Sequence, residues 1–167
     1  AGNAEIQERD EDWQAFREAL AMVCTSLARQ IAADGEGASR LITCNVCGAR
    51  DDDTATVLAK AVCSSSLLKA AMFGADANWG RVLCAMGYSG AEFDPEKVDV
   101  DFSSDKGKIS VCKAGRAVDF DEGKAKEILL RPEVTIDIDV HEAGGSAVAW
   151  GCDLTYDYVK INGDYRT

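Results

Sequence analysis

Apolar positions near the start of the chain follow a helical period. They recur every three or four residues: Trp13, Phe16, Leu20, Val23, Leu27 and Ile31. Because residues at this spacing share one face of a helix, the pattern predicts an amphipathic helix from Asp10 or Asp12 to about Ala33. The acidic residues at its start suit the positive end of the helix dipole, and Gly35 follows its end as a stop signal.

The rest of the chain alternates between short helical patterns and strands. Strands are predicted over residues 39–49, 97–102, 108–112 and 134–140. Helices are predicted over residues 54–64, 66–72, 81–86 and 121–130, and Pro132 closes the last of them. Gly144 and Gly145 predict a turn, and residues 146–161 are expected to form one or two further strands. These mixed runs of helices and strands predict an α+β fold.

Length and charge narrow the classes of protein to consider. The 167 residues (17.8 kDa) suffice for one domain with a substantial core, or for one domain plus part of a neighbour. With 29 acidic against 18 basic residues the net charge is −11, which argues against a nucleic acid partner. Charged residues interrupt every apolar stretch before the roughly 20 residues of a membrane span, and the N-terminus has no pattern of a secretory signal. We expect a cytoplasmic protein without a membrane partner.

The seven cysteines are odd in number and scattered among apolar residues, which predicts reduced, core or half-buried thiols. Cys44 and Cys47 form the one C-x-x-C pair, but residues three apart on a strand point to opposite faces of the sheet. The single histidine, His141, is far from them along the chain, so we expect no structural zinc and no other metal. The acidic residues 51–53 are expected to cap the following helix.

The first candidate for a binding residue is Glu36. It lies between two glycines in residues 34–38 (Asp-Gly-Glu-Gly-Ala), at a junction of helix and strand where the backbone can approach a ligand closely. The alternative is a helix C-cap in which the glycines supply left-handed turns and Glu36 lies in water.

Two further segments have a structural and a functional interpretation. In the polar loop 73–80, Asn78 is expected to cap the next helix and Asp76 to favour its dipole, whereas Trp79 could line a pocket. His141 follows a strand and lies beside Glu142, so an acid–base role stands against a structural one. Neither segment contains a nucleophile motif such as G-x-S-x-G.

The polar tail 162–167 directly follows an apolar segment and would ordinarily fray. If it is ordered, Asn162 and Thr167 offer an amide, a hydroxyl and the terminal carboxylate to a polar ligand. The residues alone therefore predict an acidic α+β protein with ligand contacts at Glu36 and the tail, and no complete catalytic set.

Several segments together resemble one family. They are residues 34–38, the stretch 73–81 (Phe-Gly-Ala-Asp-Ala-Asn-Trp-Gly-Arg), residues 87–90 (Gly-Tyr-Ser-Gly) and the closing sixteen residues 152–167. In this order, and over the whole chain, they strongly resemble the ornithine acetyltransferase family, the bifunctional glutamate N-acetyltransferases of arginine biosynthesis. The stretch 73–81 and the closing residues are the most specific.

The resemblance implies a precursor that cleaves itself into two chains, the second of which begins with a nucleophilic threonine. That threonine takes the acetyl group from N2-acetylornithine and passes it to glutamate, without a cofactor but with acetyl-CoA as an alternative donor in some members. Glu36, Asn162 and Thr167 match substrate-binding positions of the family. The implied fold is the end of an N-terminal-nucleophile-like αββα domain (residues 1–45), a smaller C-terminal α+β domain (46–148), and a terminal strand and substrate-contacting tail (149–167).

This chain departs from the family at its first residue, because Ala1 stands where the second chain would begin with threonine. Its first residues resemble a stretch inside that second chain, so the nucleophile is expected on a companion chain in an α/β hetero-oligomer, and this chain alone is expected to be inactive. Two alternatives remain: a non-catalytic assembly or interaction module, and an N-terminal-nucleophile amidase of related fold that hydrolyses its substrate.

Overall fold

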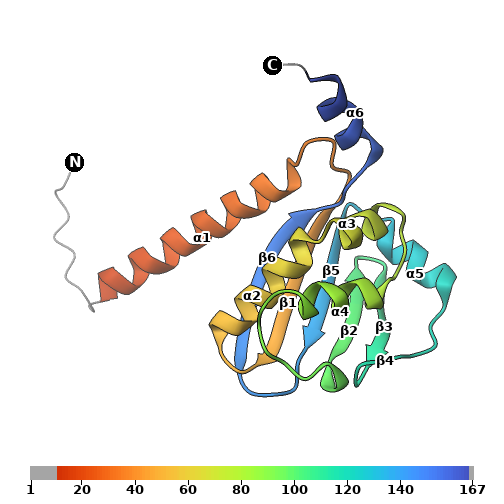
Figure 1. The fold of residues 1–167 in the computed structure, drawn as a ribbon. Coiled ribbons are helices and arrows are strands. Elements are labelled where there is room, and N and C mark those ends of the chain that lie inside the picture. The colour runs from red at the N-terminus through yellow and green to blue at the C-terminus, as the bar shows by residue number, and fades with distance from the viewer. Residues whose placement is uncertain (1–10, 166–167) are drawn as a thin grey trace.

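A single mixed sheet organises the chain in the computed structural model, which describes residues 11–165 (Figure 1). Within that range the sheet has six strands in the order β4-β3-β2-β5-β1-β6. The strands are β1 (Leu41–Ala49), β2 (Asp99–Ser104), β3 (Gly107–Lys113), β4 (Arg116–Ala117), β5 (Glu133–Asp139) and β6 (Gly145–Cys152). β1 runs parallel to β5 and antiparallel to β6, while β2 is antiparallel to both β3 and β5. This mixture confirms the predicted α+β class.

One face of the sheet carries the core. Period-two alternation turns Ile42, Phe102 and Ile136 inward, where each is almost completely buried. Four helices supply the other side of the same hydrophobic cluster: α2 (Asp52–Ser64), α3 (Ser66–Phe73), α4 (Trp79–Gly87) and α5 (Glu122–Leu129). Figure 1 shows α2 and α4 lying across the central strands. Cys44 is buried in this core and Cys47 is exposed on the opposite face, as the strand register predicts.

Two helices stand apart from the core. α1 (Glu11–Ala33) extends to one side of the sheet, and α6 (Tyr156–Asp164) lies near one end of it (Figure 1). Neither helix has a buried residue. The apolar face predicted for α1 is present but uncovered in this structure, with Phe16 47% and Ile31 75% exposed.

The structure corrects two expectations from the sequence. Residues 156–161 form a helix and not a strand, because the Thr155 side chain accepts a hydrogen bond from the Tyr158 N–H and caps α6. Three cysteines are exposed, not core or half-buried: Cys24, Cys47 and Cys84. The sequence patterns also missed the two-residue strand β4 and the short 3-10 helix Pro95–Lys97.

The predicted domain boundary between residues 45 and 46 falls inside β1, so residues on both sides of it share one sheet. The assignment of residues 1–45 to a catalytic domain stays a prediction. No single helix in the described range has the length and apolar character needed to cross a membrane; only the bent pair α2 and α3 reaches them jointly. Within residues 11–165, no group of three or more histidine, cysteine or acidic residues is arranged to hold a metal ion.

Candidate functional site

Glu36 and Asn162 meet in the structure, although 126 positions separate them in the sequence. The Asn162 Nδ2 donates a hydrogen bond to Glu36 Oε2 at 2.5 Å and a second one to the Tyr158 carbonyl at 2.9 Å. Both side chains belong to exposed residues, so a solute can reach the carboxylate. Thr167, the third candidate, lies outside the described residues.

The turn that presents Glu36 depends on Gly37. This residue has φ +67°, a left-handed conformation that glycine adopts without steric cost. A Cβ at this position would lie 2.8 Å from the backbone nitrogen of Tyr158, in the first turn of α6. The Thr155 hydroxyl donates to the Gly37 carbonyl at 2.6 Å while it caps α6, so loop and helix are joined directly. The positive φ predicted near the end of α1 therefore belongs to Gly37, where it sets the contact with α6.

A buried carboxylate holds the other end of this loop. The side chain of Asp153, which has no exposed surface, accepts hydrogen bonds from the backbone N–H groups of Ser39 (2.7 Å) and Arg40 (3.0 Å). The Ser39 hydroxyl donates to it at 2.5 Å, and the Arg40 guanidinium lies 3.5 Å away. We call these three residues, Ser39, Arg40 and Asp153, the carboxylate clamp.

The clamp also reaches the loop 73–80. The Arg40 guanidinium donates to the carbonyl oxygens of Met72 (2.8 Å) and Phe73 (3.0 Å). The Phe73 ring then packs edge-to-face on Tyr156 of α6, with ring centroids 5.4 Å apart. In the same loop the Asn78 side chain caps α4, as predicted, and donates to Asp76. Three segments distant in sequence thus converge: the loop 34–40, the loop 73–80 and residues 152–162.

This arrangement can bind charge but provides no nucleophile. An exposed carboxylate beside a side-chain amide suits a ligand that carries an ammonium group, since the carboxylate accepts hydrogen bonds and balances the charge. Glu36 could therefore contact a cationic amino acid at the end of α1. Acyl transfer additionally requires an activated hydroxyl, thiol or amine within reach of the substrate carbonyl.

His141 lies at the far end of the sheet from Glu36. Leu41 and Cys47 face Glu133 and Asp139 in the parallel pair, so about 20 Å of strand separates the two ends. The His141 ring nitrogens lie 3.0 Å from the Asp99 and 3.4 Å from the Asp139 carboxylate, contacts that favour a structural role.

The nearby thiol of Cys47 is poorly suited to nucleophilic chemistry. Partial burial and the neighbouring Asp139 and Asp137 carboxylates raise the pKa of Cys47, which disfavours the reactive thiolate.

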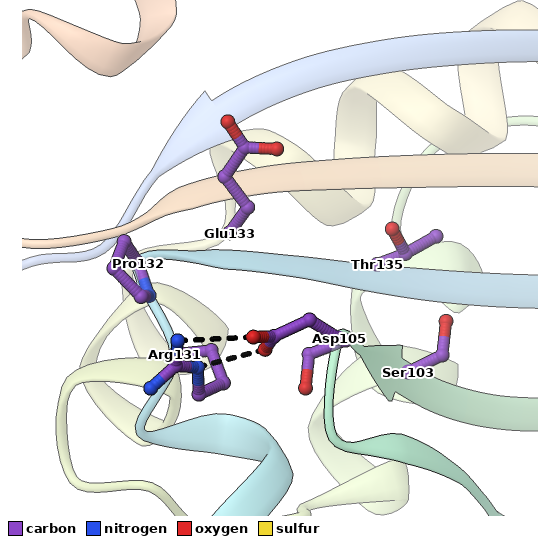
Figure 2. Close-up of a pocket in the computed structure, with 7 residues that line it drawn as sticks. Ser103, Asp105, Arg131, Pro132, Glu133 and Thr135 are labelled. Atoms are coloured by element: carbon purple, nitrogen blue, oxygen red, sulfur yellow. Dashed lines mark hydrogen bonds and ion pairs between the residues drawn. The ribbon is translucent and has the colours of Figure 1, made fainter.

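A separate pocket of about 440 Å³ opens at the ends of β2 and β5. Figure 2 shows its charged residues, with the Arg131 guanidinium bound to Asp105 by two hydrogen bonds of 2.7 and 3.0 Å. Glu133 on its rim forms an ion pair with Arg29 of α1 at 3.2 Å. Its lining includes neither Glu36 nor Asn162, and its principal charges already have partners.

Comparison with known proteins identifies the family. The model of the ArgJ family matches residues 1–167, the whole chain. The chain belongs to the ArgJ family. It is 49% identical over its full length to the arginine biosynthesis bifunctional protein ArgJ 1 of Clostridium acetobutylicum, and 52% identical to the ArgJ of Symbiobacterium thermophilum. It spans 41% and 40% of the length of these two curated relatives.

A solved ArgJ structure supports the same assignment. The crystal structure of ArgJ from Bacillus halodurans superposes with a TM-score of 0.90 at 43% identity, over 96% of this chain and 74% of that chain. The resemblance found in the sequence motifs is therefore confirmed. Membership of the ArgJ family also accounts for the mixed sheet.

Sequence reasoning missed the carboxylate clamp. Asp153 and Arg40 are separated by 113 positions, and nothing near either residue marks it as buried. The signal exists only once β1 and β6 are paired, because Leu41 then faces Cys152 and brings the neighbouring residues together.

Proposed function

We propose that this chain is the substrate-binding part of an enzyme that transfers the acetyl group of N2-acetylornithine to glutamate, in cytoplasmic arginine biosynthesis. Glu36 contacts the ammonium group of the substrate, Asn162 orients the Glu36 carboxylate, and Thr167 completes the site. The observation that carries the proposal is the hydrogen bond between Glu36 and Asn162, two residues that match substrate-binding positions of the family.

The nucleophile belongs, in this proposal, to a companion chain that begins with threonine. The chain spans about two fifths of its curated relatives, which leaves room for such a partner. The uncovered apolar face of α1 supports it, because five large side chains at helical spacing need an apolar partner: Phe16, Leu20, Val23, Leu27 and Ile31. A groove of about 650 Å³ between α1 and the start of β1 and β5 extends this surface.

The chemistry proceeds in two steps. The companion threonine attacks the acetyl carbonyl, ornithine leaves, and the acetyl-threonine ester then transfers its acetyl group to the amine of glutamate. Donors in the companion chain stabilise the negative charge that develops on the carbonyl oxygen. The role of Glu36 is to hold the amino acid in position, and positioning of this kind contributes strongly to rate.

Steady-state kinetics of the complete enzyme test this proposal. Removing the Glu36 charge with Glu36→Gln should raise the KM for N2-acetylornithine about tenfold or more, since a charge-assisted hydrogen bond is lost. Glu122→Gln, on the exposed first turn of α5, is the matched control and should leave kinetics unchanged.

The same assay separates the alternatives. Unchanged kinetics in Glu36→Gln would contradict the substrate contact and favour an interaction module. Release of acetate without formation of acetylglutamate would instead identify a hydrolase. Replacing N2-acetylornithine with acetyl-CoA shows whether that second donor is used.

A further inference from the structure

A fully buried carboxylate is costly unless it is well paired, and Asp153 is completely enclosed at the end of β6. It meets this requirement with four donors, all from two consecutive residues, Ser39 and Arg40. These residues end the loop that carries Glu36, while Asp153 begins the segment that leads into α6 and Asn162. The clamp therefore joins the roots of both elements that present the candidate site.

We propose that Asp153 is a positioning residue for substrate binding, which acts through Ser39 and Arg40 to fix the distance between Glu36 and Asn162. This inference rests on the proposed function, because it assigns a role toward the same site. Asp153 itself is buried and does not contact the substrate.

The surroundings explain why this spacing needs a clamp. α6 has no buried residue, so core packing does not fix its place. The Thr155 hydroxyl on Gly37 and the Phe73 ring on Tyr156 attach its first turn, and the Glu36 contact attaches its last. Arg40 extends the same restraint to the loop 73–80 through two carbonyl oxygens. Loosening the clamp should therefore shift both partners of the Glu36–Asn162 contact.

Asp153→Asn is the most informative change. The amide oxygen can still accept from the two backbone N–H groups, but the amide nitrogen would face the Ser39 hydroxyl and the Arg40 guanidinium, both of which donate. We expect kcat/KM for N2-acetylornithine to fall about tenfold to 100-fold in the complete enzyme, mostly through KM, because small displacements of positioning groups have effects of this size.

A double-mutant cycle separates positioning from general stability. If Asp153 acts through Glu36, then adding Asp153→Asn to Glu36→Gln should lower kcat/KM by no more than about threefold beyond the weaker single variant. Effects that multiply, or a folded Asp153→Asn enzyme with unchanged KM, would overturn the proposal. Asp99→Asn, an ion-paired aspartate at the far end of the sheet, is the matched control.

Two measurements keep the test decisive. If Asp153→Asn does not fold, Ser39→Ala removes only one donor from the clamp and should raise KM non-additively with Glu36→Gln, while Ser39→Thr restores the hydroxyl and the KM. Hydrogen exchange of the 167-residue chain alone tests the clamp without the enzyme. Faster exchange over residues 34–40 and 156–162 in Asp153→Asn would support positioning even if Glu36→Gln showed no kinetic effect. Unchanged exchange would overturn it.

Discussion

The contact between the Glu36 loop and α6 can be tested with one methyl group. Gly37→Ala places a Cβ 2.8 Å from the Tyr158 nitrogen and 3.0 Å from the Asp157 carbonyl carbon. It also forces alanine into a left-handed conformation at φ +67°, which costs about 1–2 kcal/mol. The chain can relieve both by moving α6 away from the loop.

The free energies of the two outcomes are comparable. Two hydrogen bonds, from Thr155 to Gly37 and from Asn162 to Glu36, attach α6 to the loop, and each contributes about 0.5–1.5 kcal/mol. Their loss therefore costs about as much as the strain that it relieves, and no buried core residue of α6 is lost with them. We expect Gly37→Ala to detach α6 and to lower the global free energy of unfolding by no more than about 1–3 kcal/mol.

Hydrogen exchange measured by mass spectrometry provides the assay. Peptides from residues 156–164 should exchange faster in Gly37→Ala, while peptides from the central strands β1 and β5 should not change. Gly163→Ala is the matched control within α6: a Cβ there meets nothing within 4 Å, and alanine favours the helix by about 0.5–1 kcal/mol, so exchange should slow. Unchanged protection of α6 in Gly37→Ala would refute this account of the contact.

Three further predictions concern stability and reactivity. Phe102→Ala empties a fully buried site between β2 and the helices and should cost about 3–5 kcal/mol in chemical denaturation; a loss under 1 kcal/mol would contradict the described core. Hydrogen bonds from the side chain and backbone of Thr54 lower the pKa of Asp51 from 3.8 to about 2, so its stabilising effect is complete above pH 4 and lost as the pH falls towards 2. The thermal midpoint of Asp51→Asn should accordingly change less over that range than that of the unmodified chain. The raised pKa of Cys47 should make this exposed thiol react with iodoacetamide at pH 7.5 more slowly than N-acetylcysteine does, by mass spectrometry; equal rates would count against the pKa shift.

Local patterns were sufficient for most elements of the fold. α1 was predictable because its apolar residues keep one period for more than five turns, and β5 because it alternates without interruption. α6 was not, because its apolar residues also fit an alternating pattern and the capping role of Thr155 depends on one hydroxyl. The exposure of α1 was equally inaccessible, since an amphipathic pattern predicts an apolar face without specifying what covers it.

The candidate site divides in a similar way. Glu36 was identifiable from the glycines around it, and Asn162 from a polar tail that resembles a family motif. Their contact was not, because it depends on where the helix α6 returns to the loop after the whole sheet has been built. The carboxylate clamp was hidden for the same reason, since its members become neighbours only through the antiparallel pairing of β1 with β6.

The most direct test of the proposed acetyl transfer is the intact mass of each polypeptide in the complete enzyme, before and after incubation with N2-acetylornithine. We predict an acetyl adduct on a companion chain that begins with threonine, its loss on addition of glutamate, and an unmodified 167-residue chain. An adduct on the 167-residue chain, or turnover by this chain without a companion, would contradict the account.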